Sequence, residues 1–229
     1  MYWLNNRVYI KGEGKFINEK YLKREQEVYP QGVEELKTNK LLLKTALVSN
    51  FINYDNIYLN GFYNYFSFEN IRSKKSYERF IKISNEFKLY KKINLQGNFA
   101  FRLRTGISSN QNSPFASFVA DTYLNIRGVG DRIARGTAEL ATNLEYRHYI
   151  NSYRSLKLTG VGFVDAGTWR NPAGKIKELI EYDSAVFYSG IGVRVHLSKF
   201  YNSIFRLDYS VNLRDINNRV LIFGVGQYF

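Results

Sequence analysis

Cysteine is absent from this sequence of 229 residues, and proline occurs only three times. Without cysteine there is no disulfide framework, no thiol nucleophile and no thiolate metal site. Pro30, Pro114 and Pro172 all lie in stretches that we interpret as loops, so the candidate strands contain no breaker. Long apolar runs are also missing. No stretch approaches the roughly 20 consecutive apolar residues of a membrane-spanning helix, which excludes a helical membrane protein.

The common catalytic motifs are missing as well. The sequence has no Gly-x-Ser-x-Gly elbow, no His-Glu-x-x-His pair and no Gly-x-x-x-x-Gly-Lys-Ser/Thr loop. Gly128 and Gly130 begin a dinucleotide fingerprint but lack its third glycine. His148 and His196, the only histidines, lie on predicted strands, where we interpret them as polar residues rather than metal ligands. We therefore expect a non-enzymatic protein without a cofactor or metal.

The residues that are present alternate between apolar and polar at short range. Hydrophobic residues make up 45% of the sequence and aromatic residues 17%, yet mean hydropathy is only -0.36. The net charge of +13 is spread along the candidate strands, as at Lys82 with Lys88 and Arg102 with Arg104, and is not gathered in one helix or tail. This distribution favours a lumen wall or an anionic lipopolysaccharide surface over nucleic acid as the partner of the charges.

Alternation delimits about ten candidate strands. In the clearest of them, Phe205, Leu207 and Tyr209 share one face, and Arg206 and Asp208 share the other. Such strands are typical of a transmembrane barrel with apolar residues towards lipid. Two strands, 40–52 and 56–69, are apolar on both faces, and their orientation stays open. If the N-terminal strands are irregular, only eight strands close. The candidate strands are 7–15, 40–52, 56–69, 77–91, 95–108, 137–150, 156–169, 184–198, 203–213 and 219–229.

The linkers between these strands alternate between short and long along the chain. Outer-membrane barrels have short periplasmic turns and long extracellular loops, so this parity places both termini in the periplasm. The last candidate strand ends on Phe229 without a polar tail, as the C-terminal strand of a bacterial outer-membrane barrel does. We predict that Phe223, Val225 and Phe229 form an insertion signal for the host barrel-assembly machinery. The short linkers are 53–55, 92–94, 151–153 and 199–202, and the long ones are 17–39, 111–135 and 170–183.

These observations predict one all-β domain over residues 1–229, a transmembrane antiparallel β-barrel of the bacterial outer membrane. The alternative is a soluble lipocalin-like barrel with the apolar face inward, and periodicity alone does not separate the two. The terminal Phe229, the abundant aromatics and the loop asymmetry favour the membrane barrel. The first residues contain no apolar signal-peptide core, so we expect a mature form or the C-terminal part of a longer chain.

Two motifs are more specific than the barrel pattern. Ile-Arg127-Gly128-Val-Gly lies in a long loop and is followed by a strand that carries Glu145. The next strand contains Gly162-Phe163-Val-Asp165-Ala-Gly167-Thr-Trp. Because Glu145 and Asp165 both fall on the inward phase of neighbouring strands, a long loop can bring the Arg127 guanidinium to both carboxylates. A bidentate contact between arginine and a carboxylate is strong and geometrically specific.

In this order and spacing, the motifs resemble those of the BamA/TamA outer-membrane assembly-factor superfamily, also called the bacterial surface antigen family. The resemblance covers about 95–229. It implies that the loop folds into the lumen and that Arg127 meets Glu145 and Asp165, with Gly162, Phe163 and Gly167 forming the strand motif. It further implies a role in inserting or translocating proteins or lipids. The sequence departs from the family at Val129, where an aromatic is usual, and it contains neither POTRA modules nor sixteen strands.

Two other functions stay open at the level of the sequence. One is a passive pore with anion preference, and the other is the transport domain of a patatin-like autotransporter. As partners we expect outer-membrane lipid, lipopolysaccharide and the host assembly machinery, and no nucleic acid. Because about ten strands offer little lumen for the loop, we also expect either a homodimer or a seam where the first and last strands do not pair fully. The lumen arginines of the pore would be Arg102, Arg104, Arg147, Arg194 and Arg206.

Overall fold

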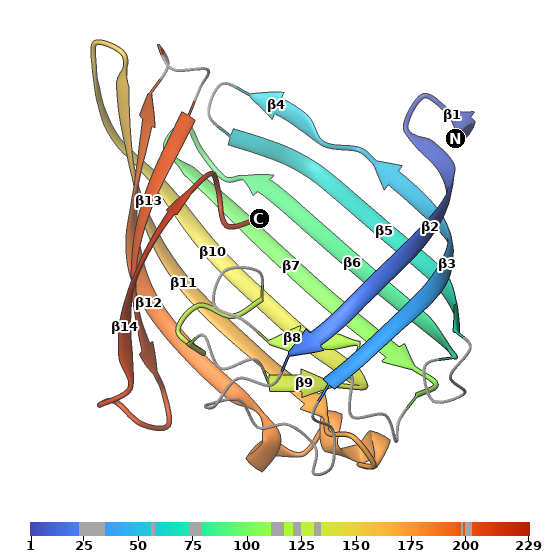
Figure 1. The fold of residues 1–229 in the computed structure, drawn as a ribbon. Helices are drawn as coiled ribbons and strands as arrows, with labels where there is room; N and C mark the ends of the chain where they lie inside the picture. Colours follow the sequence, from blue (N-terminus) through green and yellow to red (C-terminus); the bar gives the residue numbers. More distant parts are fainter. Residues whose placement is uncertain are drawn as a thin grey trace.

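The computed structural model describes most of the chain and shows a curved antiparallel sheet (Figure 1). Twelve strands form this sheet, in the order β1-β2-β3-β5-β6-β7-β10-β11-β12-β13-β14, with β4 paired to β5. A second sheet of two short strands, β8 and β9, lies on its concave side. The described residues are 1–22, 35–55, 58–73, 79–110, 117–120, 125–130, 134–197, 199 and 203–229.

The strands at the N-terminal end are β1 (Tyr2–Asn5), β2 (Val8–Leu22), β3 (Glu35–Asn50), β4 (Asn53–Asp55), β5 (Tyr58–Ser73), β6 (Phe80–Lys92) and β7 (Gly97–Ser108). The C-terminal half contains β8 (Phe118–Ala120), β9 (Ala134–Gly136), β10 (Ala138–Tyr153), β11 (Leu156–Arg170), β12 (Val186–Leu197), β13 (Ser203–Asn212) and β14 (Arg219–Val225). Two short 3-10 helices, η2 (Ile176–Leu179) and η3 (Tyr182–Ser184), lie between β11 and β12. In the described residues, no helix is long and apolar enough to span a membrane.

Each of the ten predicted strands has a counterpart, but the sheet contains twelve strands because two short ones were missed. β1 folds back on the start of β2 through a turn in which the Asn5 side chain accepts hydrogen bonds from the backbone N–H of Arg7 and Val8, each at 2.8 Å. β4 occupies 53–55, which was predicted as a linker, and pairs with the first residues of β5. Segments this short show too few alternations to be detected from the sequence.

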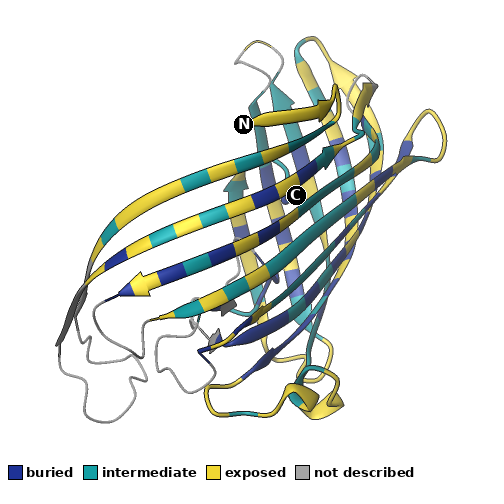
Figure 2. Cartoon of the chain, turned by 90° about the vertical axis from the view of Figure 1, so that its right-hand side faces the viewer, coloured by how far each residue is buried: buried dark blue, intermediate teal, exposed yellow. Residues whose placement is uncertain are grey.

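Alternation places the apolar side chains on the outer, convex face and the polar ones on the inner face. Figure 2 shows this as stripes of exposed and buried residues along the strands. On β13, Leu207 and Tyr209 are exposed, whereas Asp208 and Ser210 are fully buried. The structure also settles the two strands whose orientation was open. On β3 and β5 the leucines and phenylalanines at the outer face are Leu41, Leu43, Leu47, Phe62, Phe66 and Phe68.

The two ends of the sheet differ in their connections (Figure 1). At one end, β6 and β7 are joined by residues 93–96, and β10 and β11 by residues 154–155. At the other end, 109–137 connects β7 to β10, and 171–185 connects β11 to β12. The predicted loop 17–39 is shorter than expected, since β2 continues to Leu22 and β3 begins at Glu35. Pro172 lies in a connection, and Pro30 and Pro114 fall outside the described residues.

The sheet has two free ends. In the described part of the chain, no backbone pairing joins β14 to β1 or β2, which are the other end of the strand order. The last strand also ends earlier than predicted, at Val225 rather than at Phe229. Gly226 has φ +89°, a conformation that favours glycine, and the chain turns there towards the concave side, where the C-terminus lies in Figure 1.

Candidate functional site

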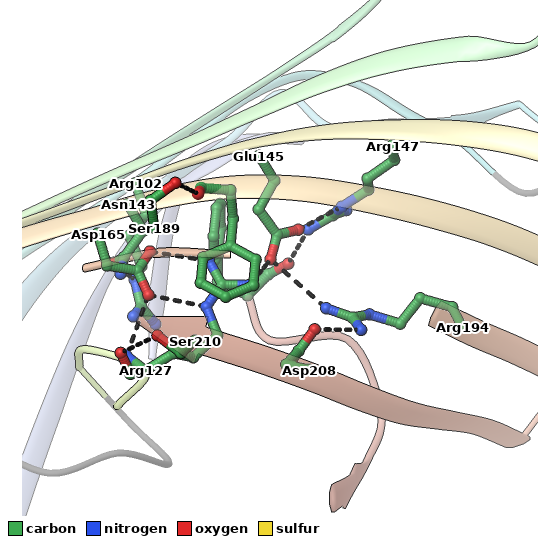
Figure 3. A network of polar contacts seen from close by, with 12 residues as sticks. Arg102, Arg127, Asn143, Glu145, Arg147, Asp165, Ser189, Arg194, Asp208 and Ser210 are labelled. Carbon is green, nitrogen blue, oxygen red and sulfur yellow. Dashed lines mark hydrogen bonds and ion pairs between the residues drawn. The ribbon is translucent and has the colours of Figure 1, made fainter. Parts of the chain in front are cut away.

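The loop segment 125–130 lies against the inner wall, and its Arg127 is 0% exposed. The guanidinium donates two parallel hydrogen bonds to Asp165 of β11, from Nε to Oδ2 at 2.7 Å and from Nη2 to Oδ1 at 2.8 Å (Figure 3). The backbone N–H of Arg127 donates to the same carboxylate at 3.0 Å. Nη1 donates to Oε1 of Glu145, on β10, at 2.5 Å. The structure thus brings Arg127, Glu145 and Asp165 together.

Aromatic rings cover both sides of the same guanidinium. The Cζ of Arg127 lies 3.6 Å from the ring centroid of Phe163 and 4.3 Å from that of Tyr228. Burial on its own lowers the pKa of Arg127, but the hydrogen bonds to Asp165 and the charges of both carboxylates raise it above the usual value. The cation therefore stays charged, with its edges on carboxylates and its faces on rings.

The Arg127 contacts continue into a wider ionic network along the inner wall (Figure 3). The second oxygen of Glu145 accepts a hydrogen bond of 2.7 Å from Nε of Arg147. Arg194 of β12 lies with Nη2 at 3.8 Å from Glu145 and donates from Nη1 to Asp208 of β13 at 2.6 Å. All five of these side chains are buried. Since Glu145 is shared by Arg127, Arg147 and Arg194, the network ties β10, β11, β12 and β13 to the loop.

Hydrogen bonds also hold the backbone of the loop segment 125–130 against the inner wall. Ser210 Oγ donates to the carbonyl oxygen of Arg127 at 2.9 Å, and Asn143 Nδ2 donates to that of Asn125 at 2.8 Å. Gly128 has φ +98°, and a Cβ there would lie 2.6 Å from the Tyr188 ring and 2.7 Å from Ser210 Oγ. Only glycine fits this position.

An apolar cluster anchors the loop beside the ionic network. Ile126 is fully buried and packs with Phe118, Trp169 and Tyr188, and Val129 packs against the same cluster. Val129, where the resemblance predicted an aromatic, therefore contributes to the apolar contact.

The glycines of the strand motif occupy two different faces. Gly162 lies on the exposed, outer face, where an added Cβ would meet nothing within 4 Å, whereas Gly167 is buried against Ile126. Phe163 points inward, as its contact with Arg127 requires. His148 is exposed on the outer phase, and His196 lies half-buried on the inner phase.

The C-terminal residues belong to this site, which the sequence did not predict. Tyr228 is buried, and burial raises its pKa, so the ring that covers Arg127 stays neutral. The carbonyl oxygen of Phe229 accepts a hydrogen bond of 3.0 Å from Arg147 Nη2, and the Phe229 ring lies 5.0 Å from Cζ of Arg102. Phe229 therefore faces the lumen, and its predicted place on the terminal strand is wrong. In the sequence, the only sign of the turn that brings these residues inward was Gly226, which directly precedes them.

The other two residues of the predicted insertion signal lie where the sequence placed them. Phe223 and Val225 are 61% and 67% exposed on the outer face of β14. Their role in insertion stays a prediction, and Phe229 is separated from them by the turn at Gly226.

Comparison with known proteins identifies a similar fold. No protein-family model matches the sequence, and no curated protein matches it. The crystal structure of BamA from Haemophilus ducreyi lacking POTRA domains 1–3 matches with a TM-score of 0.66 and 12% sequence identity. The match covers 98% of this chain and 51% of that chain, so this chain spans about half the length of its structural neighbour. The chain therefore has a BamA-like barrel fold.

Proposed function

We propose that this chain is a non-enzymatic β-barrel protein of the bacterial outer membrane that acts in the insertion or translocation of proteins or lipids. The observation that carries the proposal is the free end of the sheet at β14, on a BamA-like fold with an apolar outer face. Unpaired backbone groups are unfavourable in lipid, where no water can satisfy them. A free strand edge at this depth therefore favours pairing with an incoming strand.

The lumen network supports this role by confining movement to the edges of the sheet. The contacts of Arg127 connect β10, β11 and β13, so the wall on that side is held together by buried hydrogen bonds. β14 lies beyond this wall and pairs with β13 over only seven residues, Phe205 to Val211. The site would thus act as a rigid support beside a strand that can open.

The test uses a photo-reactive phenylalanine analogue at Phe223 of β14, in the full chain reconstituted into lipid vesicles. A small outer-membrane barrel is added unfolded as the substrate. We expect the substrate to fold faster than in empty vesicles and to cross-link at Phe223. The matched control carries the analogue at Leu207, which is also exposed on the outer face but lies on β13, one strand away from the edge. Equal cross-linking at both positions, or no acceleration, contradicts the proposal.

A passive, anion-preferring pore is the second candidate, since Arg102, Arg147, Arg194 and Arg206 are buried on the inner wall and Arg104 is partly buried there. Several of these arginines already pair with protein groups. Arg104, for example, lies 3.4 Å from Glu139. Large, steady, anion-selective openings in planar bilayers would favour the pore. A transport domain of a patatin-like autotransporter would instead move a passenger encoded in the same reading frame.

The outer face, the ends of the sheet and the last strand each suggest a partner for the chain. We propose that the apolar outer face contacts outer-membrane lipid and that basic residues near the ends of the sheet contact lipopolysaccharide. Phe223 and Val225 would be recognised by the host barrel-assembly machinery. A second copy of the chain could cover the free ends of the sheet.

A further inference from the structure

Arg206 of β13 points towards the free edge of the sheet. Gly224 of β14 is the residue opposite Arg206, and a Cβ added at Gly224 would lie 2.9 Å from Nη2 of Arg206 and 3.0 Å from its Cζ. The guanidinium therefore lies over the backbone of β14, in the space that the glycine leaves. β14 is the last strand of the order, so no strand of the described part of the chain pairs with it on the far side.

This guanidinium lacks an acidic partner. Arg206 is only 6% exposed, yet its Nε and Nη1 have no hydrogen-bond partner among the described residues. No carboxylate of the same residues lies within ion-pair distance of Arg206, and its contact is with the Tyr228 ring, whose centroid lies 4.8 Å from Cζ. A buried cation without an anion is costly, so an acidic group from outside the chain would lower the free energy here.

The acid that follows on the same face, Asp208, leans the other way. Its Oδ1 accepts a hydrogen bond of 2.6 Å from Arg194 of β12, and a Cβ added at the opposite residue of β12, Gly192, would collide with that oxygen. Oδ2 of Asp208 has no hydrogen-bond partner in the described residues, but it makes no ion pair with Arg206. The carboxylate thus lies over β12 and the guanidinium of Arg206 over β14, so only the cation faces the edge.

We propose that Arg206 selects the substrate strand that pairs with the free edge of β14, by binding an acidic side chain that this strand carries on its inner face opposite Gly224. This inference rests on the proposed function and specifies which strand the edge accepts. Directly opposite residues of antiparallel strands have Cβ atoms roughly 4.5 to 5.5 Å apart, so a carboxylate at that place reaches the guanidinium over Gly224. The contact supplies the buried N–H groups with a charged acceptor.

A strand of a protein substrate fits this place better than β2 of a second copy. β2 presents Glu13 on its inner face, but Glu13 already pairs with Lys15 at 2.6 Å and with Lys11 at 3.7 Å. With Glu13 opposite Gly224, the two lysines would add positive charge beside Arg206, which itself lies opposite Arg194. Like charges at opposite positions destabilise a sheet. The matching strand therefore carries an acid without flanking cations.

The test measures which strand the edge accepts, with the full chain in lipid vesicles and a photo-reactive phenylalanine analogue at Phe223. The probes are synthetic peptides of about eleven alternating apolar and polar residues, the length of a membrane-spanning strand. They differ only at the central polar position, which is glutamate, glutamine or lysine. We expect half-maximal cross-linking at an about tenfold lower concentration of the glutamate peptide than of the glutamine peptide, because only glutamate gives Arg206 a charged acceptor. The lysine peptide should bind most weakly.

The position of the cross-link reports the register. Antiparallel pairing that places the glutamate opposite Gly224 places the next residue of the peptide opposite Phe223. We therefore expect the cross-link on the residue directly after the glutamate, as mapped by mass spectrometry.

Variants connect the preference to Arg206. Arg206→Gln should abolish the preference for glutamate, while the glutamine peptide still cross-links. Lys88→Gln is the matched control and should keep the preference, because it removes a positive charge from the inner face of β6, where Lys88 pairs with Glu86 at 2.8 Å. If Arg206→Gln does not fold, Gly224→Ala tests the same contact, since its methyl group displaces the guanidinium from β14 and should reduce the preference.

The outcomes separate this inference from the proposed function. Equal cross-linking of all three peptides, or a preference that survives in Arg206→Gln, overturns the role of Arg206 and leaves the acceptance of strands at β14 intact. Cross-linking of none of the peptides contradicts the acceptance of strands at β14, and the selection by Arg206 with it.

Discussion

Arg127 is the residue on which the inner wall depends most directly. Its guanidinium meets carboxylates at its edges and aromatic rings on both faces, and no part of it reaches solvent. Such an arrangement is rigid because each contact requires the planar fork of arginine. It is also fragile, since the carboxylates would remain buried if the cation were removed.

Replacing Arg127 by alanine should lower the free energy of unfolding by about 3 to 5 kcal/mol, because removing one partner leaves buried charges uncompensated. Arg127→Lys should recover only part of this loss, since an ammonium cannot make the bidentate contact with Asp165. Denaturant titration of the folded protein in detergent measures both effects. The control is Lys177→Ala, which removes an exposed ion pair with Glu181, where about 1 kcal/mol or less is expected. Equal losses at the two positions would contradict a stabilising role for the contacts of Arg127 with Glu145 and Asp165.

At the scale of the strand, alternation decides which residues meet lipid. Leu89 and Lys88 are neighbours on β6, with Leu89 exposed on the outer face and Lys88 on the inner phase beside Glu86. The same charge therefore has different consequences at the two positions.

Leu89→Arg should reduce the yield of folded, membrane-inserted protein, because an arginine on the lipid face costs up to about 2 to 4 kcal/mol near the bilayer midplane. Lys88→Arg places the same guanidinium one residue away, facing the lumen, and should insert normally. Heat-modifiable migration on gels measures the folded fraction of each variant. Normal insertion of Leu89→Arg would show that the outer face does not contact lipid.

At the scale of the whole molecule, the described strands form a curved sheet with free ends, in which the first and last strands do not pair with each other. The match to about half of a larger barrel chain is in keeping with this shape. The sequence already predicted either a homodimer or an incomplete seam, and the described residues contain no pairing across the seam. The homodimer stays a prediction.

Cysteines at Val8 of β2 and Val225 of β14 test the seam without background, because the chain has no cysteine of its own. A disulfide needs Cα atoms within about 7 Å, so strands that do not pair should not be bridged. We expect no intrachain bridge on oxidation, and a covalent dimer where two copies meet through these edges. Efficient intrachain bridging without a dimer band would show a closed monomer.

The local pattern of residues determined the strands and their faces. Alternation requires no long-range information, because successive side chains in a strand point to opposite sides. It therefore predicted ten strands and the inward phase of Glu145 and Asp165, and the Arg127 motif predicted their partner. It missed β1 and β4, and also β8 and β9 in the predicted loop 111–135, because these strands are too short to show a period.

Only the tertiary structure decided which distant residues share the lumen. The sequence extended the last strand to Phe229, because nothing local indicates that the turn at Gly226 brings Tyr228 onto Arg127 and Phe229 towards Arg147. In the same way, the opposition of Arg194 and Arg206 depends on the register of β12 with β13. Such contacts join positions far apart in the chain or depend on how strands align, so the alternation within one strand carries no information about them.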